Sequence, residues 1–287
     1  MSPVRRIKNR LWIILAVVFF CLGCPGLYYV GRPLPIPIRQ QLFDGIIYYR
    51  RFHLLPRPYF AHIITVDLKT PGLQFLVTPG DPQADHPLTA RTTSKFLSEY
   101  GAQVAVNGDG FTPWHSTSLF DYYPHPGDPV KPNGKAASQG VQYASGSEAT
   151  LYISNDNVAS FISPESGMYN AISGDRILVE NGSTVPGQDD GIAAPRTAIG
   201  LDSSGQKLII VVIDGRQPFY SQGATLGELA AIMLYYGADT AMNLDGGGSS
   251  TLVVQGAQGP RVLNSPIDLH IPGRERAVAN HLGIFVP

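Results

Sequence analysis

The fold of this chain is decided by residues 196–254, which read RTAIGLDSSGQKLIIVVIDGRQPFYSQGATLGELAAIMLYYGADTAMNLDGGGSSTLVV. Within this stretch, Lys207–Ile213 is an almost continuous apolar run of strand length, which predicts a buried strand. Thr225 is followed three residues later by Glu228, the spacing of a capping box, and apolar residues then recur at helical intervals. We therefore predict a helix over residues 225–236 that follows this strand.

Two predicted strands of this stretch end in acidic loops that contain glycine. Asp214-Gly215-Arg216 follows the first strand, and residues 245–250 follow a short predicted strand over residues 241–244. Consecutive glycines remove every Cβ from the turn, so the backbone amides can approach an oxygen-rich anion or a sugar. One such loop alone is typical of a tight turn with a side-chain hydrogen bond. Two of them around one helix, with Arg196 close in the order of elements, favour a binding site.

Four segments of this stretch together closely resemble the phosphodiester glycosidase family. They are Arg196–Gly200, Asp214–Arg216, Gly223–Leu229 and Asn243–Thr251. The NLDGGGSST segment is the most specific of them, and the resemblance extends from about residue 63 to residue 286. It implies an enzyme that removes a sugar from a sugar-1-phosphodiester.

This reaction fits the residue types in the two loops. Breaking a glycosidic bond passes through an oxocarbenium-like state, which nearby carboxylates stabilise. We expect Asp245 and Asp214 to be the catalytic carboxylates, with nucleophile and base unassigned between them. Phosphate is a good leaving group, so cationic donors and backbone amides that hold it matter more than a strong acid. The residues expected to bind substrate are Asn107, Asp109, Arg196, Thr197, Arg216, Gly246, Gly247, Gly248, Ser249, Ser250 and Arg276.

A third polar loop, Asn107-Gly108-Asp109-Gly110-Phe111, follows the predicted strand Gln103–Val106. The resembled family carries an Asn-Gly segment followed by aromatic residues here, so we expect Asn107 to contact substrate. Asp109 is open to three interpretations: a catalytic group, a metal ligand, or a cap of the turn. Arg276 matches a position where the family commonly has arginine before its last strand.

The loop over residues 112–128 interleaves aromatic residues and histidines with Asp and Pro. Such a loop suits a platform on which sugar rings stack, and it equally suits a compact loop that packs its own aromatics. His115, His125, Asp121 and Asp128 match no metal-site spacing, so we predict neither a metal nor another cofactor.

Residues 1–30 are predicted to be a signal anchor. Four basic residues precede the apolar run Leu11–Cys24, a pattern that leaves the basic end in the cytoplasm and the domain outside it. A cleaved signal peptide, a lipoprotein processed before Cys24 and a buried helix are the alternatives. Residues 31–60 contain a Pro run and are predicted to be a linker that extends away from the membrane.

The remaining residues, 61–287, are predicted to form a single α+β domain with a mixed, mostly antiparallel sheet and few helices. Residues 61–68 are expected to open it as a strand that pairs with residues 73–78. Hydrophobic residues make up 44% of the chain, which suffices for a core, and the net charge of −1 argues against nucleic acid as a partner. Both cysteines lie in the N-terminal segment, so the domain has no disulfide.

We therefore predict a membrane-anchored, extracytoplasmic glycosidase that hydrolyses a sugar-1-phosphodiester or a related envelope or exopolysaccharide glycan. Its partners are this carbohydrate and the membrane. Fold does not fix function, so two alternatives stay open: a noncatalytic carbohydrate-binding protein of the cell envelope, and a different hydrolase acting on envelope polysaccharide. Two strand-end carboxylates beside arginines favour an enzyme, because a binding protein would not need both.

Overall fold

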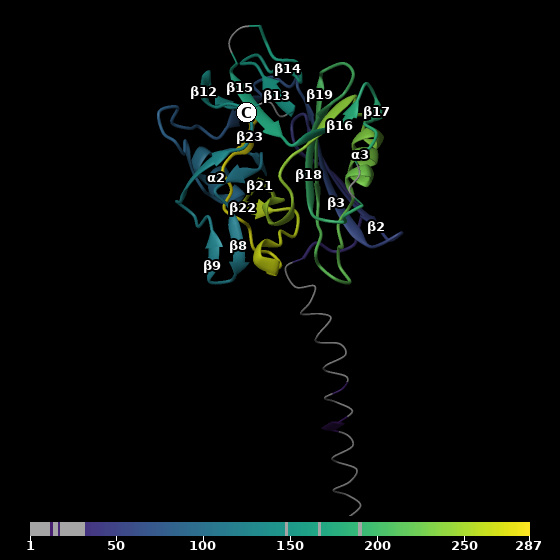
Figure 1. The fold of residues 1–287 in the computed structure, drawn as a ribbon. Helices are drawn as coiled ribbons and strands as arrows, with labels where there is room; N and C mark the ends of the chain where they lie inside the picture. Colours follow the sequence, from purple (N-terminus) through teal and green to yellow (C-terminus); the bar gives the residue numbers. More distant parts are fainter. Residues whose placement is uncertain (1–11, 14–16, 18–31, 147–148, 166–167, 189–190) are drawn as a thin grey trace, which may run out of the picture. The chain divides into compact units, whose positions relative to one another are not determined.

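Figure 1 shows the computed structural model, which describes residues 12–13, 17, 32–146, 149–165, 168–188 and 191–287. The chain divides into two compact units, residues 1–34 and residues 35–287. The predicted signal anchor lies almost entirely outside the described residues. Within the described ranges, no helix has both the length and the apolar character needed to cross a membrane.

Residues 35–287 contain many short strands and two α-helices. The strands are β1 Ile38–Phe43, β2 Ile46–His53, β3 Tyr59–Asp67, β4 Gln74–Val77, β5 Leu88–Thr89, β6 Val104–Asn107, β7 Phe111–Thr112, β8 His115–Ser118, β9 Asp121–Tyr123, β10 Pro129–Pro132, β11 Ala136–Ser138, β12 Val141–Ala144, β13 Ala149–Ile153, β14 Ala159–Ser160, β15 Asn170–Gly174, β16 Arg176–Glu180, β17 Ser183–Thr184, β18 Arg196–Leu201, β19 Lys207–Ile213, β20 Thr240–Asn243, β21 Leu252–Gly256, β22 Gly259–Val262 and β23 His281–Phe285. The helices are α2 Thr93–Tyr100 and α3 Leu226–Tyr235, with 3₁₀ turns η1 Gly247–Ser249 and η2 Asp268–His270.

Antiparallel pairing joins these strands into sheets. The largest sheet has eight strands in the order β1-β2-β3-β19-β18-β20-β16-β17. A second sheet has the order β22-β21-β6-β23-β4, and a third has the order β12-β11-β15-β13-β14. Strand β19 pairs along its whole length with β3, from Lys207 opposite Asp67 to Ile213 opposite Ala61. On its other edge it pairs with β18, from Leu208 opposite Leu201 to Ile213 opposite Arg196.

The two faces of β19 explain why its apolar run is continuous. Leu208, Ile210 and Val212 belong to the core cluster shared with β6, β21 and β23 of the second sheet. Ile209, Val211 and Ile213, on the other face, pack in a second cluster with α3. The outer face of the second sheet is covered in the same way by α2. The two sheets therefore form the middle layers of a four-layer arrangement, with α2 and α3 on opposite sides (Figure 1).

Helix α3 confirms the predicted capping box. The Thr225 side chain accepts a hydrogen bond from the Glu228 amide at 3.2 Å, and the Glu228 carboxylate accepts one from the Thr225 amide at 2.8 Å. The predicted helix over residues 225–236 is present as α3, and all of the pairs between named strands are antiparallel, in agreement with the α+β class. The strands form several sheets, however, and not the single sheet that was predicted.

Two predictions near the start of the domain are wrong. Residues 38–53 are not a tether: they form the hairpin β1–β2, and β2 pairs with β3 from Ile46 opposite Val66 to His53 opposite Tyr59. The prolines around this hairpin obscured it, although Ile46 and Tyr48 are buried at alternate positions. Residues 73–78 do not pair with β3 either. Strand β4 pairs with β23 in the second sheet.

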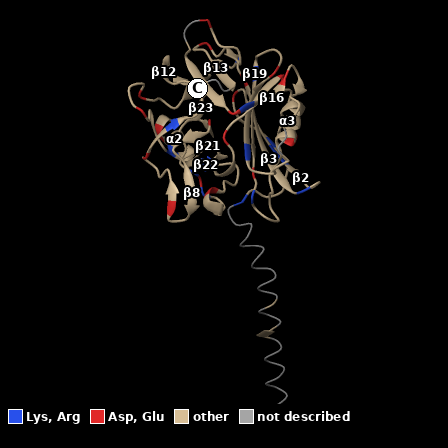
Figure 2. Ribbon diagram, in the orientation of Figure 1, with Lys and Arg blue, Asp and Glu red and all other residues tan. Residues whose placement is uncertain are grey.

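Charged residues are scattered among these elements and are not gathered on one face (Figure 2). This agrees with a formal net charge of −1. Charged side chains gather locally instead, near the ends of β6, β19 and β20.

Helix α3 should contribute strongly to stability through Leu229, which is fully buried against the large sheet. We expect Leu229→Ala to lower the free energy of unfolding by about 3 kcal/mol, because it removes buried methyl groups and leaves a cavity. Leu54→Ala is the control, since Leu54 is 65% exposed. Urea unfolding followed by circular dichroism measures both. Similar small losses for the two variants would contradict this packing.

Candidate functional site

A cavity of about 620 Å³ lies beside the ends of β6, β19 and β20 and the start of β18. Its walls combine acidic, basic and aromatic side chains with glycine backbone. They are formed by Asp109, Gly110, Phe111, Trp114, Asn133, Asp175, Ala194, Pro195, Arg196, Arg216, Asn243, Leu244, Asp245, Gly246, Gly247 and Arg276. The two acidic loops and the Asn-Gly loop thus meet at one place.

Asp245 follows the last residues of β20 and is held by its backbone. Its amide donates to the Gly108 carbonyl at 3.0 Å, and its carbonyl accepts from Asn107 Nδ2 at 2.8 Å. Its carboxylate accepts a hydrogen bond from the Gly246 amide at 2.9 Å. Desolvation raises the pKa of Asp245, while hydrogen bonding and the charge of Arg276 act in the opposite direction. The pKa of Asp245 therefore depends on the charges that surround it in the cavity.

Three arginines reach the same cavity from different segments. Arg196 donates to two backbone carbonyls, Ala224 O at 3.3 Å and Ile192 O at 2.8 Å. Arg216 is exposed, yet partial burial lowers its pKa, and the charges of Arg276 and Arg196 lower it further. Like charges repel unless an anion joins them, so this cluster is suited to a phosphate.

Arg276 is the best anchored of the three arginines. Its Nε donates to Asp268 Oδ1 at 2.8 Å, and its guanidinium carbon lies 5.1 Å from the centre of the Trp114 ring. Nη1 lies 3.4 Å from the Ser249 hydroxyl. Trp114 therefore forms an aromatic wall at the cavity, as a sugar-stacking platform requires.

The glycines of the NLDGGGSS loop are needed for this convergence. A Cβ on Gly248 would lie 2.6 Å from Arg276 Nη2, and a Cβ on Gly247 would lie 2.9 Å from Arg216 Nη1. Gly247 also has a φ of +63°, which side chains other than glycine rarely adopt. Any larger residue at these positions would push the arginines away.

Two further carboxylates line the cavity. Asp109 is 3% exposed, and its Oδ2 accepts a hydrogen bond from the Gly134 amide at 2.6 Å. Asp175 accepts a hydrogen bond from Asn243 Nδ2 at 2.7 Å, and its charge contributes to the raised pKa of Asp245. The structure therefore offers Asp109 and Asp175 as partners for Asp245.

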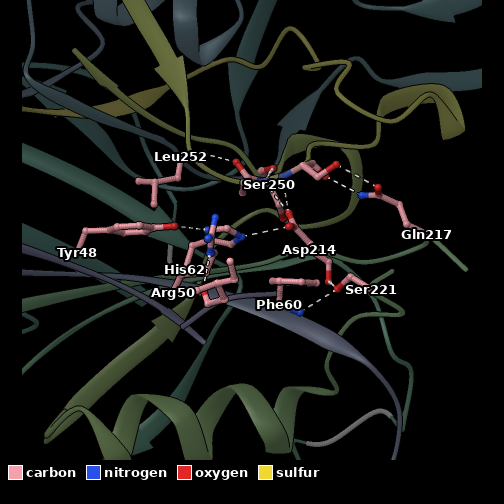
Figure 3. Close-up of polar contacts among 12 residues, drawn as sticks. Tyr48, Arg50, Phe60, His62, Asp214, Gln217, Ser221, Ser250 and Leu252 are labelled. Atoms are coloured by element: carbon pink, nitrogen blue, oxygen red, sulfur yellow. Dashed lines mark hydrogen bonds and ion pairs between the residues drawn. The ribbon is translucent and has the colours of Figure 1, made fainter. Parts of the chain in front are cut away.

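Asp214 does not line this cavity, which corrects the expectation that it forms a carboxylate pair with Asp245. It is 1% exposed, and its Oδ1 accepts hydrogen bonds from the Ser265 amide at 2.7 Å and from Asn264 Nδ2 at 3.1 Å. Its Oδ2 lies 3.1 Å from His62 Nε2, while His62 Nδ1 lies 2.8 Å from the Tyr48 hydroxyl (Figure 3). Both of its carboxylate oxygens contact protein groups, so Asp214 acts as an anchor.

Three other expected contact residues are also buried behind the cavity wall. Asn107 Oδ1 accepts from the Thr251 amide at 3.1 Å and from the Thr197 hydroxyl at 2.9 Å. The Thr197 and Ser250 hydroxyls lie 3.2 Å apart. Asn107, Thr197 and Ser250 therefore hold the loops together and do not line the cavity, and their contact with substrate stays a prediction. Gly248 and Ser249 likewise lie in the buried layer.

The sequence did not reveal every residue of the cavity. Asn133, Asp175 and Asn243 were not among the expected site residues, although Asn243 opens the NLDGGGSST segment. The four residues considered as metal ligands form two separate exposed pairs, His115 with Asp121 and His125 with Asp128, each at 3.3 Å. Over the described ranges, no group of three or more His, Cys, Asp or Glu is placed to hold a metal ion.

Residues 74–285 match the family model described as phosphodiester glycosidase. The chain is 27% identical over 201 residues to N-acetylglucosamine-1-phosphodiester alpha-N-acetylglucosaminidase of Bos taurus, covering 63% of this chain and 36% of that protein. It is 38% identical over 99 residues to an uncharacterized SPbeta prophage-derived protein of Bacillus subtilis strain 168, covering 34% of this chain and 14% of that protein. The chain thus spans about a third of the first relative and about a seventh of the second.

Two solved structures show the same fold. A hypothetical protein from Synechocystis aligns with a TM-score of 0.65 at 15% identity, covering 88% of this chain and 64% of that one. The catalytic domain of zebrafish N-acetylglucosamine-1-phosphodiester alpha-N-acetylglucosaminidase, auto-inhibited by its pro-peptide, aligns with a TM-score of 0.59 at 20% identity, covering 91% and 93% of the two chains.

The surroundings of Asp245 predict the direction in which its pKa is shifted, and this shift can be measured. Its pKa should lie above the ordinary aspartate range because desolvation is the largest influence on it. Arg276→Gln should raise this pKa further, since it removes a nearby positive charge. Carboxyl ¹³C NMR titration, with Asp245→Asn used to assign the signal, measures both values. A pKa at or below the ordinary range, or a downward shift in Arg276→Gln, would contradict the described environment.

Proposed function

Because this chain belongs to the phosphodiester glycosidase family, we propose that it hydrolyses the bond between a sugar's anomeric carbon and a phosphodiester. The observation that carries the proposal is the presence of a desolvated carboxylate, Asp245, in the same cavity as Arg196, Arg216 and Arg276. The charges of the substrate during the reaction are complementary to this carboxylate and these arginines. Positive charge develops at the anomeric carbon, and negative charge remains on the phosphate.

The arginine cluster would hold the phosphate. Arg216 is the most accessible of the three, and its proximity to Arg196 and Arg276 is unfavourable without an anion. Binding the phosphate offsets this repulsion and stabilises the leaving group as the glycosidic bond breaks. A strong general acid is then unnecessary.

Asp245 would face the anomeric carbon and stabilise its positive charge. The Gly246 amide, which donates to its carboxylate, fixes the orientation of that group. Asp109 and Asp175 stand on the same cavity wall and are the candidates for a second carboxylate that activates water or binds a sugar hydroxyl. The Trp114 ring would stack on the apolar face of the sugar.

A noncatalytic carbohydrate-binding protein is the second candidate. Trp114 in contact with Arg276 favours sugar binding whether or not a reaction follows. The two candidates differ in turnover alone.

We also propose that the domain acts outside the cytoplasm, held to the membrane by residues 1–30, on an envelope or exopolysaccharide glycan. The support for this location is the basic flank and apolar run of the sequence.

Replacing Asp245 should remove turnover and leave the fold intact. With purified full-length protein and a panel of sugar-1-phosphodiesters, we expect Asp245→Asn to lower kcat by about 10²–10⁴, the usual contribution of such a group. The matched control is Asp121→Asn, because Asp121 is exposed and lies outside the cavity. Unchanged turnover in Asp245→Asn would contradict the role of Asp245. Saturable glycan binding without turnover of any substrate would support the binding protein.

The proposed location can be checked in intact cells. We expect the protein to remain in the membrane fraction after alkaline washing and to be digested by protease added outside the cytoplasmic membrane. Recovery in the soluble cytoplasmic fraction would contradict the anchor.

A further inference from the structure

A second cavity, of about 530 Å³, adjoins the first at Arg216, which lines both. Its walls are Pro58, Ala193, Arg216, Gln217, Pro218, Phe219 and Gln222. We propose that this second cavity binds a hydrocarbon group attached to the far side of the phosphate, so that the substrate is a sugar phosphodiester with an apolar aglycone. This inference rests on the proposed function, since it names the group that the phosphate carries besides the sugar.

The chemistry of the two cavities differs. Among the described residues, the first cavity is lined by three carboxylates and three arginines, whereas Arg216 is the only charged side chain that lines the second. The amide of Gln217 is engaged within the protein: Nε2 donates to the Ser265 carbonyl at 2.8 Å, and Oε1 accepts from the Ser265 hydroxyl at 3.0 Å. The surface left to a ligand is therefore mainly the apolar surface of Pro58, Ala193 and the Pro218–Phe219 pair.

Phe219 is the most unusual residue of this wall. Its side chain is 86% exposed, and its backbone has a φ of +63°, a conformation that aromatic residues rarely adopt. Single exposed apolar residues are common on protein surfaces, but this one forms part of a cavity next to a phosphate-binding arginine. A hydrocarbon placed against the ring would remove apolar surface from water on both partners.

The hairpin that carries Phe219 is rigidly held. The Gln217 and Ser221 backbones exchange two hydrogen bonds of 2.9 Å, and the Arg216 amide donates to the Gln222 carbonyl at 3.3 Å. The Ser221 hydroxyl donates to the Asp214 carbonyl at 2.5 Å, next to the buried Asp214 side chain (Figure 3). Because the hairpin is fixed before a ligand binds, little ordering would oppose binding.

The position of Arg216 decides which group occupies which cavity. A phosphodiester carries two substituents on one phosphorus. With the phosphate at Arg216 and the sugar beside Asp245 in the first cavity, the second substituent leaves the phosphate toward Phe219. A strongly hydrated aglycone would lose water against a wall on which Arg216 and Gln222 offer the main polar contacts, and the remaining surface is apolar.

Binding of two simple phosphates tests this inference directly. We would titrate the full-length protein with hexyl phosphate and with methyl phosphate by calorimetry. We expect hexyl phosphate to bind at least about tenfold more tightly, because it adds buried methylene groups to the same anionic head. Phe219→Ala should remove most of this preference and leave the affinity for methyl phosphate unchanged.

Two controls make the test specific. Phe120→Ala should keep the preference, since Phe120 is 96% exposed on a different hairpin and lines neither cavity. Arg216→Ala should weaken both phosphates together. Equal affinity for the two phosphates, binding of neither, or a preference that survives Phe219→Ala would overturn the inference.

The same pair of substituents, hexyl and methyl, separates this inference from the proposed function. Turnover would be measured on one sugar joined through phosphate to a hexyl or a methyl group. Cleavage with a higher kcat/KM for the hexyl compound, reduced in Phe219→Ala, is the expected result. Absence of cleavage of either compound would overturn the proposed function while the phosphate-binding comparison still decides the hydrocarbon site.

Discussion

The segments that form the site are held together by two buried polar side chains, Asn107 and Asp214. Asn107 hydrogen-bonds the Asp245 carbonyl, the Thr251 amide and the Thr197 hydroxyl, and it thereby joins β6 to the start of β18 and to the loop after β20. Asp214 hydrogen-bonds Asn264 and the Ser265 amide from the end of β19. A buried polar group that loses its partners is costly, so these contacts set the geometry of the cavity in front of them.

The charged side chains of the cavity change one another's pKa. Desolvation raises the pKa of Asp245, and the neighbouring Arg276 opposes this effect. The arginines can approach the loop because Gly247 and Gly248 have no Cβ. The site thus combines three arginines with a carboxylate, Asp245, whose ionised form is held in place by hydrogen-bond donors. Such an arrangement is prepared for a substrate that is anionic at one end and becomes cationic at its reacting carbon.

Much of this could be predicted from the sequence. The apolar run Lys207–Ile213 and the capping box at Thr225 identified β19 and α3, because periodicity and capping are local properties. The Gly-rich loop with Asp245 and the three arginines were also found, since they stand in distinctive motifs. The hairpin β1–β2 was missed, because prolines flank strands whose pairing with β3 is not visible in local pattern.

The roles of individual polar residues were harder to predict. Asp214 and Asn107 stand at strand ends, as substrate-contacting residues often do, and sequence does not show which way a strand-end side chain points. Asp175, in contrast, lines the cavity but was not predicted to do so. It reaches the cavity only because β16, which follows it, pairs with β20. Burial and pairing between distant strands are decided by the tertiary structure.

The central claim is that the chain acts at the anomeric carbon of a sugar phosphodiester, and the site of bond cleavage tests it most directly. Hydrolysis would be carried out in ¹⁸O-labelled water, and the products would be analysed by mass spectrometry. Cleavage between carbon and oxygen, as predicted here, places the label on the free sugar and leaves the phosphate unlabelled. Label in the phosphate would show cleavage between phosphorus and oxygen and would contradict a glycosidase mechanism.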